Sequence, residues 1–153
     1  MRVDPKREAA LYDYYVENGA YFVFGSNEAG VHGAGAARAA YDKYGAVWGQ
    51  GWGVFGSSFA FPTKDHNIVK LPLASVKRYA ESFKEIARLN PSATFAVTRL
   101  GCGLAGFRES DIAPLFADAP SNCILPEGWA GGGTWENTEA GRAALAEGRV
   151  PPV

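Results

Sequence analysis

The stretch that decides the fold is Ala93-Thr94-Phe95-Ala96-Val97, followed by Thr98-Arg99-Leu100-Gly101-Cys102-Gly103-Leu104-Ala105-Gly106-Phe107. The apolar run 93–97 is typical of a buried strand, and the three glycines after it leave a backbone with few side chains. In open α/β sheets ligands bind at the carboxyl ends of the strands, where bare amides can reach a phosphate. We therefore interpret 101–106 as an anion cradle, with an ordinary tight turn into the next helix as the alternative.

Length and composition predict one domain with a single core, since the chain has 153 residues. Glycine accounts for 19 of them, concentrated at 25–35, 45–56 and 101–106, where we expect backbone to approach a ligand. A net charge of −1 gives no support for a broad nucleic-acid or membrane surface. We expect a cytoplasmic protein without a membrane partner, because the sequence shows no leader and no apolar stretch of membrane-spanning length.

The two cysteines, Cys102 and Cys123, show neither metal-ligand nor disulfide spacing. Both lie beside predicted strands, so we expect buried, reduced thiols. We expect no metal ion and no cofactor.

Strand-like and helix-like segments alternate along the chain, which predicts an α/β fold with a sheet layered between helices. Residues 45–57 are rich in glycine and aromatic residues and predict a loop or an irregular edge hairpin. On the helix expected after Ser75, we assign the basic side chains to a solvated face. The expected elements are a helix starting at Asp4-Pro5, strand 21–24, helix 36–44, strand 58–61, a helix capped by Ser75, strand 93–98, a helix from Ser110, strand 122–125 and a helix over 137–147; the basic side chains are Lys77, Arg78, Lys84 and Arg88.

A second glycine-rich loop, Gly25 to Gly35, lies between a predicted strand and an alanine-rich helix. That order points helix amides toward an anion. The loop does not match the dinucleotide fingerprint, because Arg38 stands where glycine or alanine is needed and Phe55 where an acid is expected. No Gly-Lys-Ser/Thr occurs, so the phosphate loop of P-loop NTPases is excluded as well.

Three polar residues after predicted strands are candidates for chemistry. Asn27 could donate to a ribose hydroxyl or simply form a turn, and Lys64 could bind phosphate or attack a sugar carbon or simply be solvated. His32 could stack on a ligand or donate to it, but in a loop with no partner in sight we expect it to be exposed. No catalytic triad, zinc spacing or carboxylate pair is evident.

Taken together, residues 21–129 resemble a macro domain. The resemblance rests on a strand ending in Asn27, a Gly33-Ala34-Gly35 turn into a helix, Pro62-Thr63-Lys64, an amphipathic helix, and Gly101-Cys102-Gly103-Leu104. It is strongest to the branch with the terminal ADP-ribose glutamate hydrolases and the antitoxin that removes ADP-ribose from DNA thymidine, and to small phage-associated macro-like proteins. The resemblance implies a three-layer α/β/α macro-like domain with a mixed central sheet over 1–129, leaving 130–153 as an accessory tail with a short helix.

The resemblance also implies roles for individual residues. The chain would bind ADP-ribose or a related nucleotide and hydrolyse it from a modified macromolecule, either a DNA base or a protein side chain. Lys64 would act on the anomeric carbon of the ribose, and the remaining site residues would bind the ligand. These are Asn27, Gly33, Ala34 and Gly35 beside the distal ribose, and Gly101, Cys102, Gly103, Leu104, Ala105, Gly106 and Phe107 around the diphosphate and that ribose.

Two alternatives stay open. A binding module without chemistry is favoured by Ala105, because the glutamate hydrolases carry an aspartate at that position and this chain has a methyl group. A structural or interaction protein could instead use its tryptophans as a partner surface, although we expect them to be buried at the bases of loops; they are Trp48, Trp52, Trp129 and Trp135.

Overall fold

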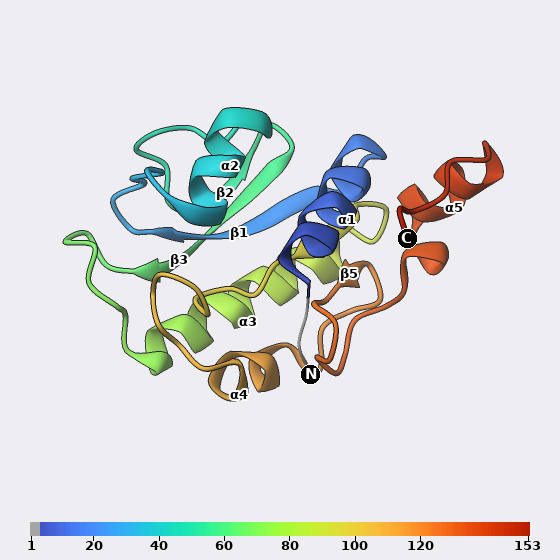
Figure 1. Cartoon of the computed structure of the whole chain (residues 1–153). Coiled ribbons are helices and arrows are strands. Elements are labelled where there is room, and N and C mark those ends of the chain that lie inside the picture. Colours follow the sequence, from blue (N-terminus) through green and yellow to red (C-terminus); the bar gives the residue numbers. More distant parts are fainter. Residues whose placement is uncertain (1–3) are drawn as a thin grey trace.

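A five-stranded mixed sheet lies between two layers of helices in the computed structural model, which describes residues 4–153 (Figure 1). The strand order is β2-β3-β1-β4-β5. Four strands are parallel, and β2 pairs antiparallel with β3 at one edge. The three-layer α/β/α architecture and the edge hairpin predicted from the sequence are thereby confirmed. The strands are β1 (Tyr21–Asn27), β2 (Gly53–Phe55), β3 (Ser58–Lys64), β4 (Phe95–Val97) and β5 (Cys123–Ile124).

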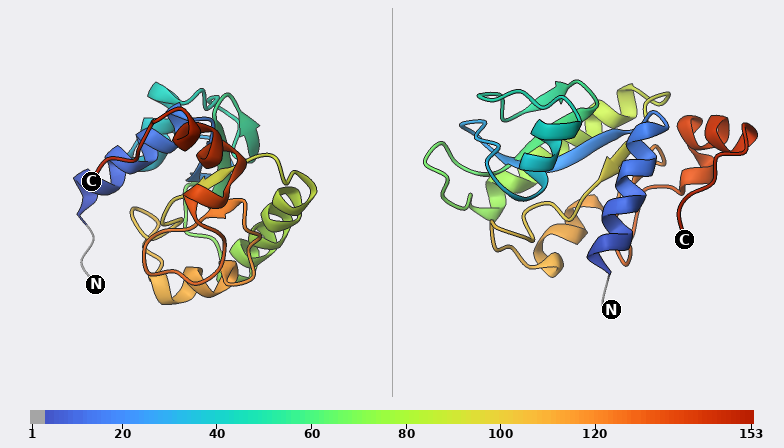
Figure 2. Two further views of the ribbon diagram at one scale, coloured as in Figure 1. Left: turned by 90° about the vertical axis from the view of Figure 1, so that its right-hand side faces the viewer. Right: turned by 45° about the horizontal axis from the view of Figure 1, so that its top comes forward.

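The helices divide between the two faces of the sheet (Figure 2). One face is covered by α1 (Pro5–Glu17) and α2 (Gly35–Lys43), with the short 3₁₀ turn Trp135–Asn137 and α5 (Glu139–Ala146) beside α1. The other face is covered by α3 (Leu73–Leu89), by α4 (Glu109–Ile112) and by the 3₁₀ turn Ala113–Phe116 that continues it.

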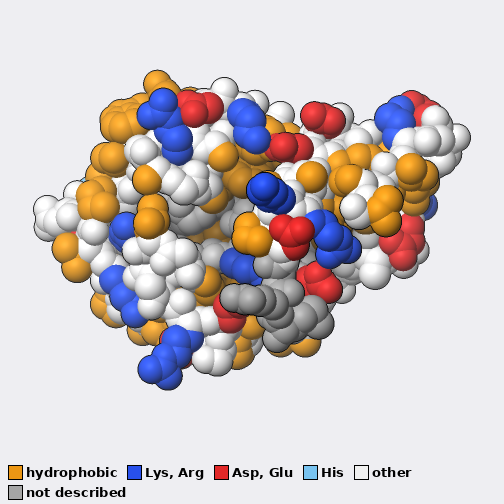
Figure 3. Space-filling model, in the orientation of Figure 1, with side chains coloured by type: hydrophobic (Ala, Val, Ile, Leu, Met, Phe, Trp, Pro, Cys, Tyr) orange, Lys and Arg blue, Asp and Glu red, His pale blue; other side chains and the backbone are white. Residues whose placement is uncertain are grey.

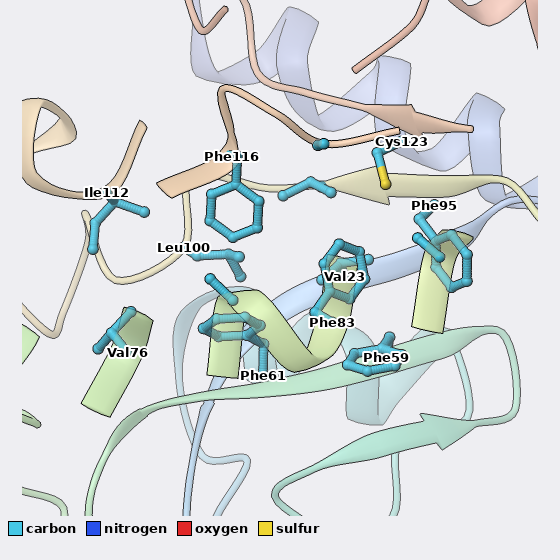
Figure 4. Close-up of a cluster of buried hydrophobic side chains, with 14 of the residues drawn as sticks. Val23, Phe59, Phe61, Val76, Phe83, Phe95, Leu100, Ile112, Phe116 and Cys123 are labelled. Atoms are coloured by element: carbon cyan, nitrogen blue, oxygen red, sulfur yellow. The ribbon is translucent and has the colours of Figure 1, made fainter. Parts of the chain in front are cut away.

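Strand β1 supplies both cores because its side chains alternate between the faces. Val23 points into the core under α3, whereas Phe22 and Phe24 point toward α1 and α2. The core under α3 is rich in phenylalanine, and the rings of Phe59 and Phe83 meet edge to face with centroids 5.1 Å apart (Figure 4).

Strands β1 and β3 run further than their apolar runs predict. Their register pairs Asn27 with Lys64, after an irregularity between Ser26 and Asn27. Strand pairing thus continues through polar residues to the carboxyl ends of β1 and β3. It places the two candidate residues, Asn27 and Lys64, next to each other on neighbouring strands.

Two expectations about α3 are wrong. The helix begins at Leu73 after Pro72, so Ser75 lies in its first turn instead of capping it. Lys84 is only 2% exposed, because its ammonium donates to Asp118 at 2.6 Å and to Glu81 at 2.9 Å. Asp118 comes from a distant segment, so helical periodicity alone could not show this partner.

The segment after residue 130 packs closely on the rest of the chain. Trp135 is buried against Tyr14 and Tyr15 of α1, and its indole nitrogen donates to the Tyr14 hydroxyl. A Cβ added to Gly131 would lie 2.4 Å from the carbonyl oxygen of Phe116, and one on Gly133 would lie 2.1 Å from that of Ser121. These glycines are therefore required by tight packing against backbone.

Candidate functional site

A cleft of about 1070 Å³ runs along β1 between α1, α2 and the loop 101–107. The space-filling view shows this face hollowed, with cationic, acidic and apolar side chains around the hollow (Figure 3). The β1 residues in its lining extend from Phe22 to Asn27, which is five residue steps of extended chain, or roughly 17 Å. A cleft of this volume is large enough for a nucleotide-sized ligand.

The cleft gathers nearly all residues that the sequence singles out. Lys64 lines it at the Asn27 end, and Gly106 lies outside the lining, where its carbonyl accepts from Lys70 at 3.4 Å. The predicted ligand-binding residues in its walls are Asn27, Gly33, Ala34, Gly35, Gly101, Cys102, Gly103, Leu104, Ala105 and Phe107.

The loop 101–107 is closed by its own backbone. The amide of Phe107 donates to the Gly101 carbonyl at 2.8 Å, and that of Gly106 donates to the Gly103 carbonyl at 3.1 Å. Gly101 has φ of +73°, and a Cβ there would lie 2.8 Å from the Phe107 ring. The amides of Gly103, Leu104 and Ala105 donate to no other group within residues 4–153. The loop therefore offers three consecutive N–H groups without an internal acceptor.

The N-terminus of α2 faces the same cleft. Ala34 is its N-cap and supplies no side-chain acceptor, so the amides of Gly35, Ala36 and Ala37 have no partner in the described chain. The first turn of a helix carries partial positive charge and attracts anions. A Cβ on Gly35 would lie 3.4 Å from Cδ1 of Leu104, so the two glycine loops meet across the cleft.

Two glycines of these loops have no explanation within the protein. Gly33 and Gly103 both line the cleft, neither has a φ in the left-handed range, and a Cβ on either would meet no atom within 4 Å. Neither backbone conformation nor a protein neighbour requires glycine here. Glycine at these two positions leaves the backbone open to the cleft, which is the condition for close approach of a ligand.

Asn27 is held by its own loop. Its amide nitrogen donates to the Val31 carbonyl at 2.8 Å, and its oxygen accepts from the Val31 amide at 2.9 Å. This is the turn-forming role, and it leaves one N–H of the side chain for a ligand.

His32 is buried, so the expectation of an exposed loop histidine is wrong. Its Nε2 lies 2.9 Å from the Val47 carbonyl, which makes this nitrogen the donor, and its Nδ1 lies 3.3 Å from the Ser26 hydroxyl. The ring anchors the first glycine loop to the loop 45–52. The sequence could not indicate this contact, because Val47 lies fifteen residues after His32, on the far side of α2.

Lys64 is half-buried at the end of β3, and its ammonium makes no hydrogen bond or ion pair within residues 4–153. The carboxylates that line the cleft are all engaged elsewhere. Asp13 is paired with Lys43 at 2.9 Å, and Glu8 and Glu109 are both paired with Arg99. Lys64 is therefore the cation of the cleft that is free to meet a ligand.

Arg99 and α1 are parts of the site that sequence reasoning missed. The guanidinium joins Glu8 of α1, Glu109 of α4 and the Glu127 carbonyl, which it reaches at 3.0 Å. It thereby fixes α1 as one wall of the cleft. The pKa of Glu109 lies below its ordinary value because Trp129 donates to the carboxylate at 2.9 Å and Arg99 adds a second bond. The helical spacing of Pro5, Glu8, Ala9 and Tyr12 is the only sequence signal for this wall.

Cys102 is a thiol at neutral pH. Burial, with a smaller contribution from the charge of Glu109, raises its pKa to about 11. A thiolate nucleophile is thus disfavoured at this position. Both cysteines are free, as predicted, although Cys102 is only partly buried.

Within residues 4–153, no three His, Cys, Asp or Glu side chains come together as a metal site. None of the helices in that range combines the length and the apolar character needed to span a bilayer. Of the four tryptophans, only Trp135 is fully buried, and Trp48 is 51% exposed, against the expectation of burial.

No protein-family model matches the sequence, and no curated protein matches it significantly.

Proposed function

We propose that this chain is a macro-like domain that binds ADP-ribose, or a related nucleotide with a diphosphate joined to ribose. The observation that carries the proposal is the cleft itself, in which two glycine loops with free amides meet and Lys64 belongs to the same lining. Two sets of amides suit two adjacent phosphates better than one. The length of cleft on either side leaves room for a sugar and a nucleoside.

The second part of the proposal is hydrolysis of ADP-ribose from a modified macromolecule by Lys64. In its unprotonated form the amine would bond to the anomeric carbon as the bond to the modified group breaks, and water would then release ADP-ribose. In its charged form it would stabilise negative charge on the departing group. A nucleic acid or a protein could carry the modification.

One observation favours binding without turnover. Ala105 places a methyl group in the cleft, and the carboxylates that line it are already paired with Arg99 or Lys43. No free carboxylate therefore stands beside Lys64 in the lining to act as a general acid or base.

Titration calorimetry with ADP-ribose, AMP and ribose 5-phosphate tests the binding claim, and we expect ADP-ribose to bind tightest. The catalytic claim is tested by release of ADP-ribose from modified DNA and from modified protein. Lys64→Ala should abolish release while leaving ADP-ribose affinity within a few-fold, and Lys77→Ala on the exposed side of α3 is the matched control. Tight binding with no release from either substrate would establish the binding module instead.

A further inference from the structure

Within residues 4–153, Ile68 is the one non-glycine residue with a positive φ, at +63°. A β-branched side chain in this conformation is strained, and such outliers concentrate at ligand sites. Its neighbour Asn67 is of a type that tolerates left-handed backbone far better. An isoleucine at this position therefore needs a reason.

The turn that follows Lys64 imposes this conformation. Lys64 pairs with Lys70 in an antiparallel bridge, and between them the Asp65 carboxylate accepts from the amides of Asn67 and Val69 at 2.8 and 3.0 Å. The Ile68 amide itself donates to the Asp65 carbonyl at 3.1 Å. These hydrogen bonds fix the backbone conformation of the turn, and this conformation sets the positive φ of Ile68.

Packing does not explain the isoleucine. Ile68 belongs to neither buried core, and its side chain is 40% exposed. It does line the cleft, as Leu104 does from the other loop at 70% exposed. Val69, the next residue, is more exposed at 58% and does not line the cleft. Of these two neighbours, the strained residue, Ile68, is therefore the one that lines the cleft.

The turn is also tied to the glycine loop. The Lys70 ammonium lies 4.4 Å above the Phe107 ring and reaches the Gly106 carbonyl at 3.4 Å. Ile68 and Leu104 are thus partly exposed apolar side chains in the lining of the cleft that also holds Lys64, and we call these two residues its apolar rim.

We propose that Ile68 is a specificity-determining residue that contacts the group joined to the anomeric carbon of the ribose. This inference rests on the proposed function, in which that carbon lies at Lys64 and its substituent meets the apolar rim. The rim favours an uncharged substituent with an apolar face, because a charged group pressed against Ile68 and Leu104 would lose its hydration without a partner.

The test compares two ligands that differ only in this substituent. ADP-ribose has a hydroxyl on the anomeric carbon, whereas NADH has a neutral planar ring there. Ile68→Gly and Ile68→Asn remove the apolar rim and relieve the strain, and Val69→Ala trims the same turn without facing the cleft. Affinities come from calorimetry and stability from thermal unfolding.

We expect Ile68→Gly to weaken NADH binding about fivefold, the change that corresponds to losing about 40 Å² of apolar contact. Binding of ADP-ribose should change less than twofold, Val69→Ala should match the wild type for both ligands, and the melting temperature of Ile68→Gly should not fall. Equal losses for the two ligands, no loss for NADH, or a clear fall in melting temperature would overturn the inference while leaving the proposed function intact. A wild-type protein that binds no ADP-ribose would overturn both.

Discussion

Replacing Gly103 by alanine should separate ligand binding from stability. A Cβ at this position meets no protein atom within 4 Å, and φ lies outside the left-handed range, so the fold accommodates the methyl group. Losing a glycine restricts the unfolded chain and stabilises a protein by roughly 0.4–1 kcal/mol where the conformation allows it. In a domain of this size we expect the melting temperature to rise by about 1–4 °C.

In the proposed complex the same methyl group would stand beside the free amides 103–105, where a phosphate would have to approach. Loss of one charge-assisted hydrogen bond costs about 2 kcal/mol, which corresponds to roughly a 30-fold weaker affinity for ADP-ribose. Titration calorimetry and thermal unfolding of the same preparations measure both quantities. Gly33→Ala in the opposite loop should behave alike, since its Cβ also meets nothing.

Gly101→Ala is the contrasting control in the same loop. Its φ of +73° and a Cβ only 2.8 Å from Phe107 predict a destabilised protein. If Gly103→Ala bound ADP-ribose as the wild type does, the amides of this loop would not hold the ligand. If it lowered the melting temperature as Gly101→Ala does, the glycine would serve the fold.

Two further predictions concern charge and pH. Cys102 should react with iodoacetamide slowly at pH 8 and increasingly fast as the pH approaches about 11, its raised pKa; fast alkylation at pH 7.5 in the native protein would contradict the raised pKa of this partly buried thiol. Asp118→Asn should lower the free energy of unfolding by about 1 kcal/mol in urea titrations, because Lys84 loses a charged partner at 2.6 Å while it keeps Glu81 and the Asp118 side chain is itself 66% exposed. The hydrogen bond from Lys84 holds the pKa of Asp118 below its usual 3.8, so in the wild type this contribution is present above that pH and is lost as the pH falls through the lower native pKa. In Asp118→Asn the loss of stability between pH 5 and pH 2 should accordingly be smaller, and an unchanged pH profile would show that the pair contributes nothing.

Those parts of the fold could be predicted in which the pattern of apolar residues within one helix or strand shows which side of it is buried. The apolar run Tyr21–Phe24 and the periodicity of α3 specified a strand and a helix, and the glycines after β1 and β4 marked the carboxyl edge of the sheet. Those features depend on neighbours within a few residues along the chain. They were sufficient for the layers and for most of the lining of the cleft.

What the sequence could not show depends on partners that are distant along the chain. The sequence indicates a solvated lysine at Lys84, whereas in the structure Lys84 is paired with Asp118. It likewise indicates an exposed loop residue at His32, whereas in the structure the His32 Nε2–H donates to the Val47 carbonyl. Arg99 reads as a polar residue between a strand and a glycine loop, yet it holds α1 through Glu8, more than ninety positions earlier in the chain. The spacing of residues along the sequence gives no information on pairs that are this far apart in the chain.

The run Gly131-Gly132-Gly133 resembles a flexible linker in composition, but each residue is pressed against a backbone carbonyl of the domain. A protease needs several residues of extended chain free of the domain, and although Gly131 is exposed, its neighbours stay packed against backbone carbonyls and Trp135 is buried against α1. Cleavage here would require the run to leave these carbonyls, and Trp135, two positions after it, ties the same segment to α1. Susceptibility of this glycine run to proteolysis therefore measures how often that wall of the cleft opens, and any ligand that holds α1 in place should slow the cut.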